Sequence, residues 1–96
     1  MVTVIFGDFE WDDEKAEANR GKHGVSFEEA TSIFLDADYL LTADRNHEDR
    51  FIALGFSALA RLLVVVHLER GERVRIISAR HATRPEAMTY ERRKDG

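Results

Sequence analysis

The sequence predicts an α+β fold with two N-terminal helices, a mainly antiparallel sheet of four to five strands, and a C-terminal helix. Three observations support this prediction. Helix-capping residues occur near both ends of the 96-residue chain, and apolar residues recur at every second position through its middle. The connections between the alternating segments are too short for the crossovers that join parallel strands. A chain of this length forms one core, so we expect a single domain over residues 1–96.

A strand and a helix are predicted first. Residues 2–6 are β-branched and aromatic, which suits a strand that could extend to Trp11. Asp12 is placed to cap a following helix, whose acidic first turn complements the positive end of the helix dipole. Gly24 is placed to end this helix near His23.

A second helix is predicted directly afterwards. Ser26 and Glu29 have the spacing of a capping box, in which each side chain accepts a hydrogen bond from the other residue's backbone amide. The helix should extend through Phe34 or Leu35. It should bury Phe27, Ala30, Ile33 and Phe34.

Four consecutive strands are predicted next, at residues 39–43, 50–58, 61–69 and 73–80. Gly71 supplies the turn between the last two, whereas no glycine marks the turn before the third. Apolar side chains occupy both faces of the third strand, so we expect the centre of the sheet to be covered on both sides.

The last helix is predicted from a second capping box, formed by Thr83 and Glu86 with Pro85 in the first turn. It should run towards Arg92 or Arg93. Helices segregated from a mainly antiparallel sheet define the α+β class.

The formal net charge of −4 conceals an asymmetry along the chain. Residues 1–49 hold four Lys and Arg against thirteen Asp and Glu, whereas residues 70–96 hold eight against four. A positive surface attracts anions even on an acidic molecule, although ordinary solvated charge would give the same composition.

Composition also excludes several classes of protein. The absence of cysteine excludes disulfides, thiolate catalysis and cysteine-bound zinc. The longest apolar run, 62–66, is too short to span a membrane. The first residues turn acidic where a secretory leader would be basic and then apolar, so we expect a cytoplasmic location.

Arg80 is a candidate phosphate-binding residue. Regular alternation in its strand would place Arg73, Arg75, Ile77 and Ala79 on one face and Val74, Ile76, Ser78 and Arg80 on the other, core-like face. Arg80 would then reach solvent only at the strand end, beside the start of the last helix. A guanidinium, free helix amides and Arg84 together suit a phosphate. Alternatively, Arg80 pairs with a carboxylate such as Glu69.

A second charged group is predicted on the neighbouring strands. Arg73 and Arg75 could line the open sheet face with His67 and Glu69, which would place an acid or base beside cationic groups. Cross-strand charge pairing explains the same residues without a function. Arg50, at the start of its strand, fits either interpretation.

The first helix carries a polar stripe, formed by Lys15, Asn19, Lys22 and His23. Such a stripe could contact RNA. The two cations in the last turn also relieve the negative end of the helix dipole, which is a purely structural explanation.

Metal and cofactor binding are not predicted. The four histidines, His23, His47, His67 and His81, have no metal-ligand spacing. No phosphate-binding glycine loop, nucleophile elbow or dinucleotide fingerprint occurs.

Two motifs lie towards the two ends of the chain. One is an I-I-S-A-R strand end followed by a Tyr-Glu pair, here residues 76–80 and 90–91. The other is a W-D-x-x-K-x-x-x-N-x-x-K-H-G-V pattern, met by Trp11, Asp12, Lys15, Asn19, Lys22, His23, Gly24 and Val25. With these two motifs the chain resembles the BrnT family of bacterial toxins over nearly its whole length.

The resemblance implies a RelE-like fold and a ribonuclease that arrests translation. It also implies a neighbouring antitoxin, BrnA, whose ribbon-helix-helix domain binds operator DNA. RelE-type cleavage needs no metal, because the RNA 2′-hydroxyl attacks the adjacent phosphate with help from a base, an acid and arginines.

Through this resemblance, Lys22, His23 and Arg80 are the matching site positions, with Arg50 and Glu69 as further candidates. We expect Arg80 to stabilise charge on the phosphate, and His23 or Glu69 to transfer the proton. The expected RNA-binding residues are Lys22, Arg75 and Arg84.

The last helix departs from the family pattern. Family members carry an arginine-rich helix there, whereas this chain has Pro85, Ala87, Met88 and Thr89. This departure would weaken RNA binding or activity. The alternative function is a non-catalytic subunit that acts with its antitoxin as a co-repressor. A stand-alone DNA-binding regulator is disfavoured, because no helix-turn-helix pattern is present.

Overall fold

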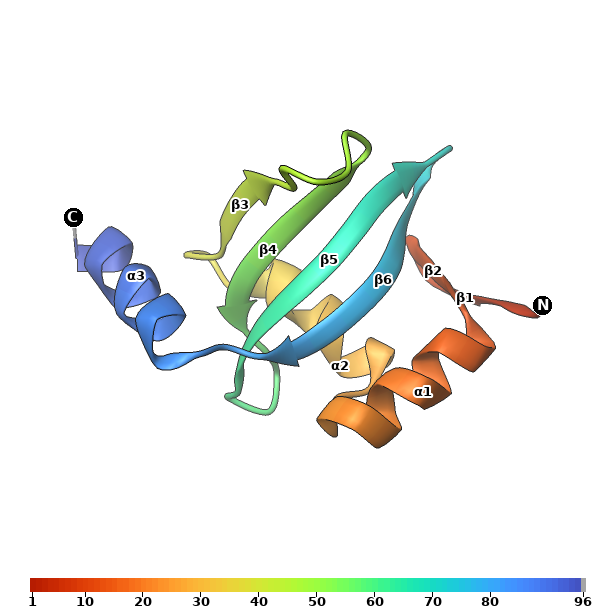
Figure 1. Ribbon diagram of the computed structural model, residues 1–96, viewed down its shortest axis with the longest axis horizontal. Coiled ribbons are helices and arrows are strands. Elements are labelled where there is room, and N and C mark those ends of the chain that lie inside the picture. Colours follow the sequence, from red (N-terminus) through yellow and green to blue (C-terminus); the bar gives the residue numbers. More distant parts are fainter. Residues whose placement is uncertain (96) are drawn as a thin grey trace.

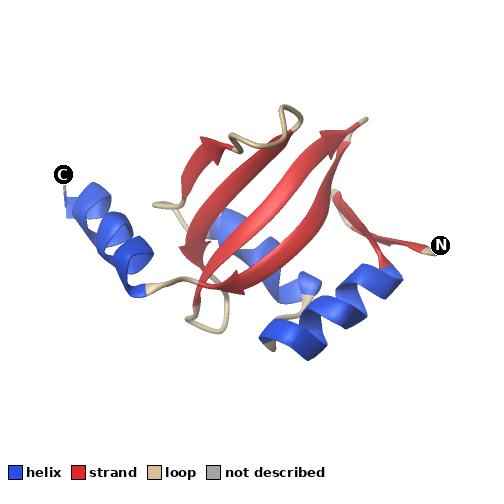
Figure 2. Cartoon of the chain, viewed as in Figure 1, coloured by secondary structure: helices blue, strands red, loops and turns tan. Residues whose placement is uncertain are grey.

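The computed structural model describes residues 1–95, which form a six-stranded sheet with helices at its sides (Figures 1 and 2). The elements in chain order are β1 (Thr3–Phe6), β2 (Phe9–Asp12), α1 (Asp13–His23), α2 (Phe27–Thr31), η1 (Ser32–Leu35), β3 (Leu40–Ala43), β4 (Arg50–Phe56), β5 (Leu62–Arg70), β6 (Arg73–His81) and α3 (Arg84–Asp95). The strand order across the sheet is β1-β2-β6-β5-β4-β3.

The predicted RelE-like sheet of four to five mainly antiparallel strands is wrong, because the sheet is six-stranded and mixed. The single N-terminal strand of the prediction is a hairpin, β1–β2, which Gly7 turns with a φ of 59°. A positive φ of this kind is accessible to glycine at little cost. β2 then pairs in parallel with β6. Between these two strands the chain passes through α1, α2 and η1 to the opposite edge of the sheet, and β3, β4 and β5 lead it back to β6.

The prediction of two regular N-terminal helices is also wrong. α1 has the predicted bounds, with Asp12 as its N-cap and Gly24 as a left-handed C-cap. The second helix has only five residues before it tightens into the 3₁₀ turn η1. The hydroxyls of Thr31 and Ser32 donate to carbonyls three residues back, at 2.7 and 2.6 Å, and these local bonds accompany the change in pitch.

The two faces of the sheet are covered to different extents. Figure 1 looks onto the open face, with α2 passing behind the sheet. The main core lies on this hidden side, where Trp11, Phe27, Ile33, Val65 and Ile76 are buried. On the open face, α3 is the only helix of residues 1–95 that packs, and it does so through Tyr90 against Leu54 and Val64.

A bulge in β6 decides where its arginines point. His67 pairs with Ile76 but Val66 pairs with Ser78, so Ile77 is an extra residue in β6. A bulge shifts the alternation of side chains by one position. Ile76 and Ala79 therefore both enter the helix-side core, at 1% and 0% exposure. The predicted placement of Arg80 on the core-like face, opposite to Arg75, is wrong.

Candidate functional site

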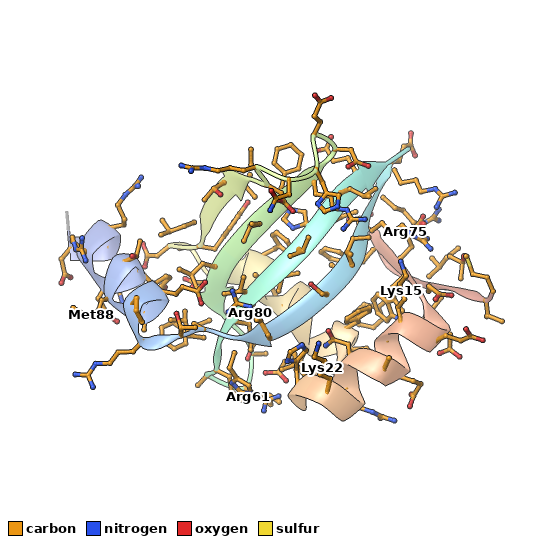
Figure 3. All side chains as sticks on the ribbon, viewed as in Figure 1. Lys15, Lys22, Arg61, Arg75, Arg80 and Met88 are labelled. Carbon is orange, nitrogen blue, oxygen red and sulfur yellow. The ribbon has the colours of Figure 1, made fainter. Side chains whose placement is uncertain are left out.

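Three of the predicted site arginines share the open face of the sheet. Leu68 pairs with both Arg50 and Arg75, and Val64 pairs with Arg80. Because residues 64 and 68 lie an even number of positions apart on β5, their partners point to the same side. Figure 3 shows Arg75 and Arg80 on this side, towards opposite ends of β6. We call this surface, with Arg50, Arg75 and Arg80, the arginine face.

Arg80 lies at the junction between β6 and α3. Its Nη1 and Nη2 donate to the two carboxylate oxygens of Glu86, at 2.8 and 2.9 Å. Nη1 also donates to the carbonyl of His81. The Arg80 side chain is still 41% exposed. A guanidinium has five N–H donors, so the Nε–H and one Nη2–H of Arg80 have no acceptor within residues 1–95.

Glu86 holds three groups at once. It accepts from Arg80 and from the backbone amide of Thr83, while its own amide donates to the Thr83 hydroxyl. The predicted capping box is therefore present and is joined to the strand end. The hydrogen bond from Arg80 lowers the pKa of Glu86 from its ordinary value of 4.5 to about 2, so this carboxylate is ionised at neutral pH. The alternative prediction, that Arg80 pairs with a carboxylate, is confirmed, although the partner is Glu86 and not Glu69.

The other two arginines differ in their pairing. Arg75 donates to Glu10 of β2 at 2.6 Å, and both side chains are nearly buried, at 11% and 12% exposure. Arg50 forms no ion pair within the described residues, and its Nε is buried without a hydrogen-bond partner. Buried polar groups normally have a hydrogen-bond partner, so the unpaired Nε of Arg50 is an exception. The guanidinium of Arg50 has no carboxylate partner within the described residues.

A second cationic group surrounds the end of β6. Arg61, in the turn before β5, binds the buried carboxylate of Glu29 through Nε and Nη2 and also donates to the carbonyl of Gly24. The Arg61 hydrogen bond lowers the pKa of Glu29, whose second buried partner is Ser57. Gly24 directly follows Lys22 and His23, so Arg61 joins the last turn of α1 to the β4–β5 turn. Lys22 and Arg61 lie at this end of the molecule in Figure 3.

The polar stripe of α1 has two parts with different roles. Asn19 is buried, and its side chain bonds the amide and carbonyl of Ala79 and the carbonyl of Val25. It therefore fastens α1 to β6 and does not face solvent. Lys15 and Lys22 are exposed and His23 is half-buried, so these three remain accessible.

The other predicted site residues lie at different distances from Arg80 along the sheet. Arg84 is exposed in the first turn of α3, two residues before Glu86. Glu69 is exposed near the far end of β5, where it pairs with Val74 and belongs to the helix side. The structure thus brings Arg80 and Arg84 to one end, with Lys22 and His23 nearby, and leaves Glu69 at the other.

A groove of about 270 Å³ runs between α3 and the open sheet face. It is lined by Leu40, Thr42, Ile52, Leu54, Val64, Glu86 and Thr89. Tyr90 fixes the helix beyond the groove, because its hydroxyl donates to the carboxylate of Asp36 at 2.7 Å. Burial and this carboxylate raise the pKa of Tyr90, so the hydroxyl stays protonated.

Three partners in these contacts were not predicted as site residues. Glu10, Glu86 and Arg61 are ordinary charged residues in the sequence, and only Glu86 had a role there, as a helix cap. Glu10, Glu86 and Arg61 pair with residues that are 65, 6 and 32 positions away, respectively. No local sequence pattern predicts these pairs.

Residues 1–95 contain neither a metal-site cluster nor a membrane-spanning helix. Within residues 1–95 no group of three His, Asp or Glu side chains has the arrangement of a metal site. In the same part of the chain, no helix has the length and apolar character needed to cross a membrane.

These observations define a class of protein. A mixed sheet with one face covered by helices, and with guanidinium groups from two strands on the other, is suited to binding an extended anion such as a phosphate backbone.

Comparison with known proteins identifies the family. The model of the ribonuclease toxin BrnT of type II toxin–antitoxin systems matches residues 11–86. The chain therefore belongs to the BrnT family of ribonuclease toxins, which implies an antitoxin partner. This confirms the resemblance seen in the sequence. None of the curated proteins compared with the chain matches it.

A solved structure supports the fold. The 1.1 Å crystal structure of the Brucella abortus ribonuclease toxin BrnT is similar, with a TM-score of 0.64 and 23% sequence identity. The alignment covers 77% of this chain and 94% of that one.

Proposed function

We propose that this chain is a metal-independent endoribonuclease that cleaves RNA and inhibits translation in the cytoplasm. The observation that carries the proposal is the half-exposed guanidinium of Arg80, with two unused N–H donors on an uncovered sheet face. Membership of a family of ribonuclease toxins supports it.

Arg80 is the proposed phosphate-binding residue. When the RNA 2′-hydroxyl loses its proton and attacks the adjacent phosphate, a bond to phosphorus forms, the bond to the 5′-oxygen breaks, and that oxygen takes up a proton. Negative charge grows on the non-bridging oxygens during this step. A fixed guanidinium beside those oxygens stabilises the transition state more than the ground state. Glu86 holds the guanidinium plane in place through two parallel hydrogen bonds, which is the role of a positioning residue.

His23 is the proposed proton-transfer group, and Lys22, Arg50, Arg75 and Arg84 are the proposed RNA contacts. The contact of Asn19 with Ala79 supports this choice, because it joins the C-terminal half of α1 to the end of β6, at the residue before Arg80. Glu69 lies towards the opposite end of the sheet, so we do not assign it to the same reaction step.

The proposed partner is a BrnA-like antitoxin with a ribbon-helix-helix domain, which neutralises the chain and carries it to operator DNA. The family supports a partner of the antitoxin class. The acidic N-terminal half supports a basic contact segment on that partner.

Expression of Arg80→Ala tests the proposal. Wild-type protein produced without antitoxin should stop growth and degrade RNA, and Arg80→Ala should relieve both effects by at least tenfold. Arg20→Ala is the matched control, since Arg20 is an exposed arginine on α1 whose ion pair with Glu17 is also exposed. Equal toxicity of the wild-type protein and Arg80→Ala, at equal protein levels, would contradict the proposal.

A non-catalytic co-repressor is the second candidate. The neutralisation of Arg80 by Glu86 favours it, because a paired arginine binds phosphate less strongly. In that case the purified chain would leave RNA uncut at high concentration, and operator binding by the antitoxin would tighten when the chain is added.

A further inference from the structure

A cavity on the helix side of the sheet is not used by the proposed cleavage site. It has a volume of about 180 Å³. Its lining comes from η1, the loop after it and four strands, namely Phe34, Tyr39, Leu41, Phe51, His67, Glu69 and Val74. Sites for drug-sized ligands have volumes of about 300–1,000 Å³, so this cavity suits a single planar ring system.

His67 lines this cavity with a fixed orientation. It is 5% exposed and contacts Phe34 edge-on, with ring centroids 5.0 Å apart. The Phe51 ring lies nearby, with its centroid 6.1 Å from that of His67. Its Nδ1 faces the carbonyl of Val65 at 3.3 Å, and because a carbonyl only accepts, Nδ1 carries the proton.

The other ring nitrogen of His67 is a free acceptor. Burial lowers the pKa of His67 below its ordinary value, so the ring is neutral at pH 7. Nε2 of a neutral ring protonated at Nδ1 has a lone pair, and no hydrogen bond to it forms within residues 1–95. This atom is not among the fully enclosed side-chain atoms that lack a partner, so it opens to the cavity and can accept from a ligand N–H.

Glu69 adds a second acceptor at the rim of the cavity. It is exposed and forms no ion pair within the described residues. Guanine is the one common RNA base whose Watson–Crick edge carries a ring N–H next to an exocyclic amino group. Partly exposed rings of Tyr39 and Phe51 offer surfaces on which a base can stack.

Cations lie next to the rim. Arg70 and Arg73 face each other at the end of the β5–β6 hairpin, directly beyond Glu69 and Val74. Both are exposed, and neither forms an ion pair within residues 1–95. The alternation of β5 and β6 starts both side chains on the open face, opposite to the cavity, so they are not assigned to the ligand of the cavity.

We propose that this cavity binds a guanine base of RNA, whose donor edge meets His67 and Glu69. The choice of RNA rests on the proposed ribonuclease function, whereas the preference for guanine rests on the two acceptors alone.

Titration of the purified full-length chain with guanosine, adenosine, cytidine and uridine 5′-monophosphates, followed by NMR of backbone amides, tests this inference. Guanosine monophosphate should shift the amides of residues 39–41 and 67–69 and bind at least tenfold more tightly than the other three. His67→Phe keeps the aromatic packing and should abolish the preference, and Glu69→Gln should reduce it at least tenfold.

Glu72→Gln is the matched control, because it removes one exposed carboxylate from the turn of the same hairpin without touching the cavity. Equal affinity for all four nucleotides, or an equal loss in Glu69→Gln and Glu72→Gln, would overturn the inference. Loss of antitoxin capture by His67→Phe with no nucleotide binding would also overturn it, in favour of a protein side chain in the cavity. Mononucleotide binding needs no cleavage, so this result is independent of whether the chain cuts RNA.

Discussion

Asn19 illustrates how one buried side chain connects the helix layer to the proposed site. Its amide satisfies the backbone N–H and C=O of Ala79, the residue before Arg80, and the carbonyl of Val25. The sequence placed Asn19 on a polar stripe with Lys15, Lys22 and His23, and helical spacing cannot tell a buried amide from an exposed one. Only the contact with β6, sixty positions away, shows the difference.

Asn19→Ala should therefore destabilise the protein strongly. The substitution leaves three buried backbone groups without partners, and we expect the free energy of unfolding to fall by about 3 kcal/mol. Urea denaturation followed by circular dichroism measures this loss. Lys22→Ala, at an exposed position of the same helix, should change stability by less than about 0.5 kcal/mol. A similar result for both variants would show that the Asn19 contacts contribute little.

Glu86 should make stability depend on pH in the acid range. Its pKa is lowered from 4.5 to about 2 in the folded protein, so the folded state favours the ionised form. The stabilisation is complete above pH 4.5 and is lost as pH falls towards about 2. Thermal melts between pH 2 and pH 6 should show this loss in the wild-type protein and a flatter curve in Glu86→Gln. Identical pH profiles would mean that the pair with Arg80 is not maintained in solution.

At the scale of secondary structure, the β6 bulge is the feature that the sequence did not show. Local patterns predicted α1, four central strands and α3, because caps and alternation are encoded by neighbouring residues. Ile77 is an apolar residue in an apolar strand and gives no sign that it is unpaired. The parallel pairing of β2 with β6 is likewise a long-range contact, which short connections cannot reveal.

Gly55 of β4 should be intolerant of a side chain. An added Cβ would lie 2.9 Å from the Cβ of Tyr39 and 3.3 Å from the carbonyl of Ile33, and neither atom can move without moving its backbone. We expect Gly55→Ala to lower the free energy of unfolding by about 1–3 kcal/mol. Denaturant titration checks this value.

Gly21 of α1 is the matched control for Gly55. A Cβ at Gly21 meets nothing within 4 Å, and its helical conformation suits alanine. Gly21→Ala should therefore raise stability by about 0.5–1 kcal/mol. Destabilisation of the Gly21 variant would mean that α1 does not lie as described.

At the scale of the whole molecule, acidic and basic residues are concentrated in different elements of the fold. The acidic N-terminal half supplies α1, α2 and the edge hairpin, whereas β6 and the start of α3 carry four of the arginines. The sequence showed that the C-terminal third is basic. It could not show that Arg75 pairs with Glu10 of β2, 65 positions away, that Arg80 pairs with Glu86 across the turn into α3, or that Arg50 has no ion pair within residues 1–95.

The central claim is that the bulge gathers guanidinium groups into one RNA-binding face. The most direct test is the dependence of the affinity for a single-stranded RNA oligonucleotide on salt concentration, since each released phosphate contact changes the log–log slope by about 0.7. We predict that Arg50→Ala and Arg80→Ala each reduce the slope by about this amount, whereas Arg20→Ala leaves it unchanged. Unchanged slopes for Arg50→Ala and Arg80→Ala, or an equal reduction in Arg20→Ala, would contradict the claim.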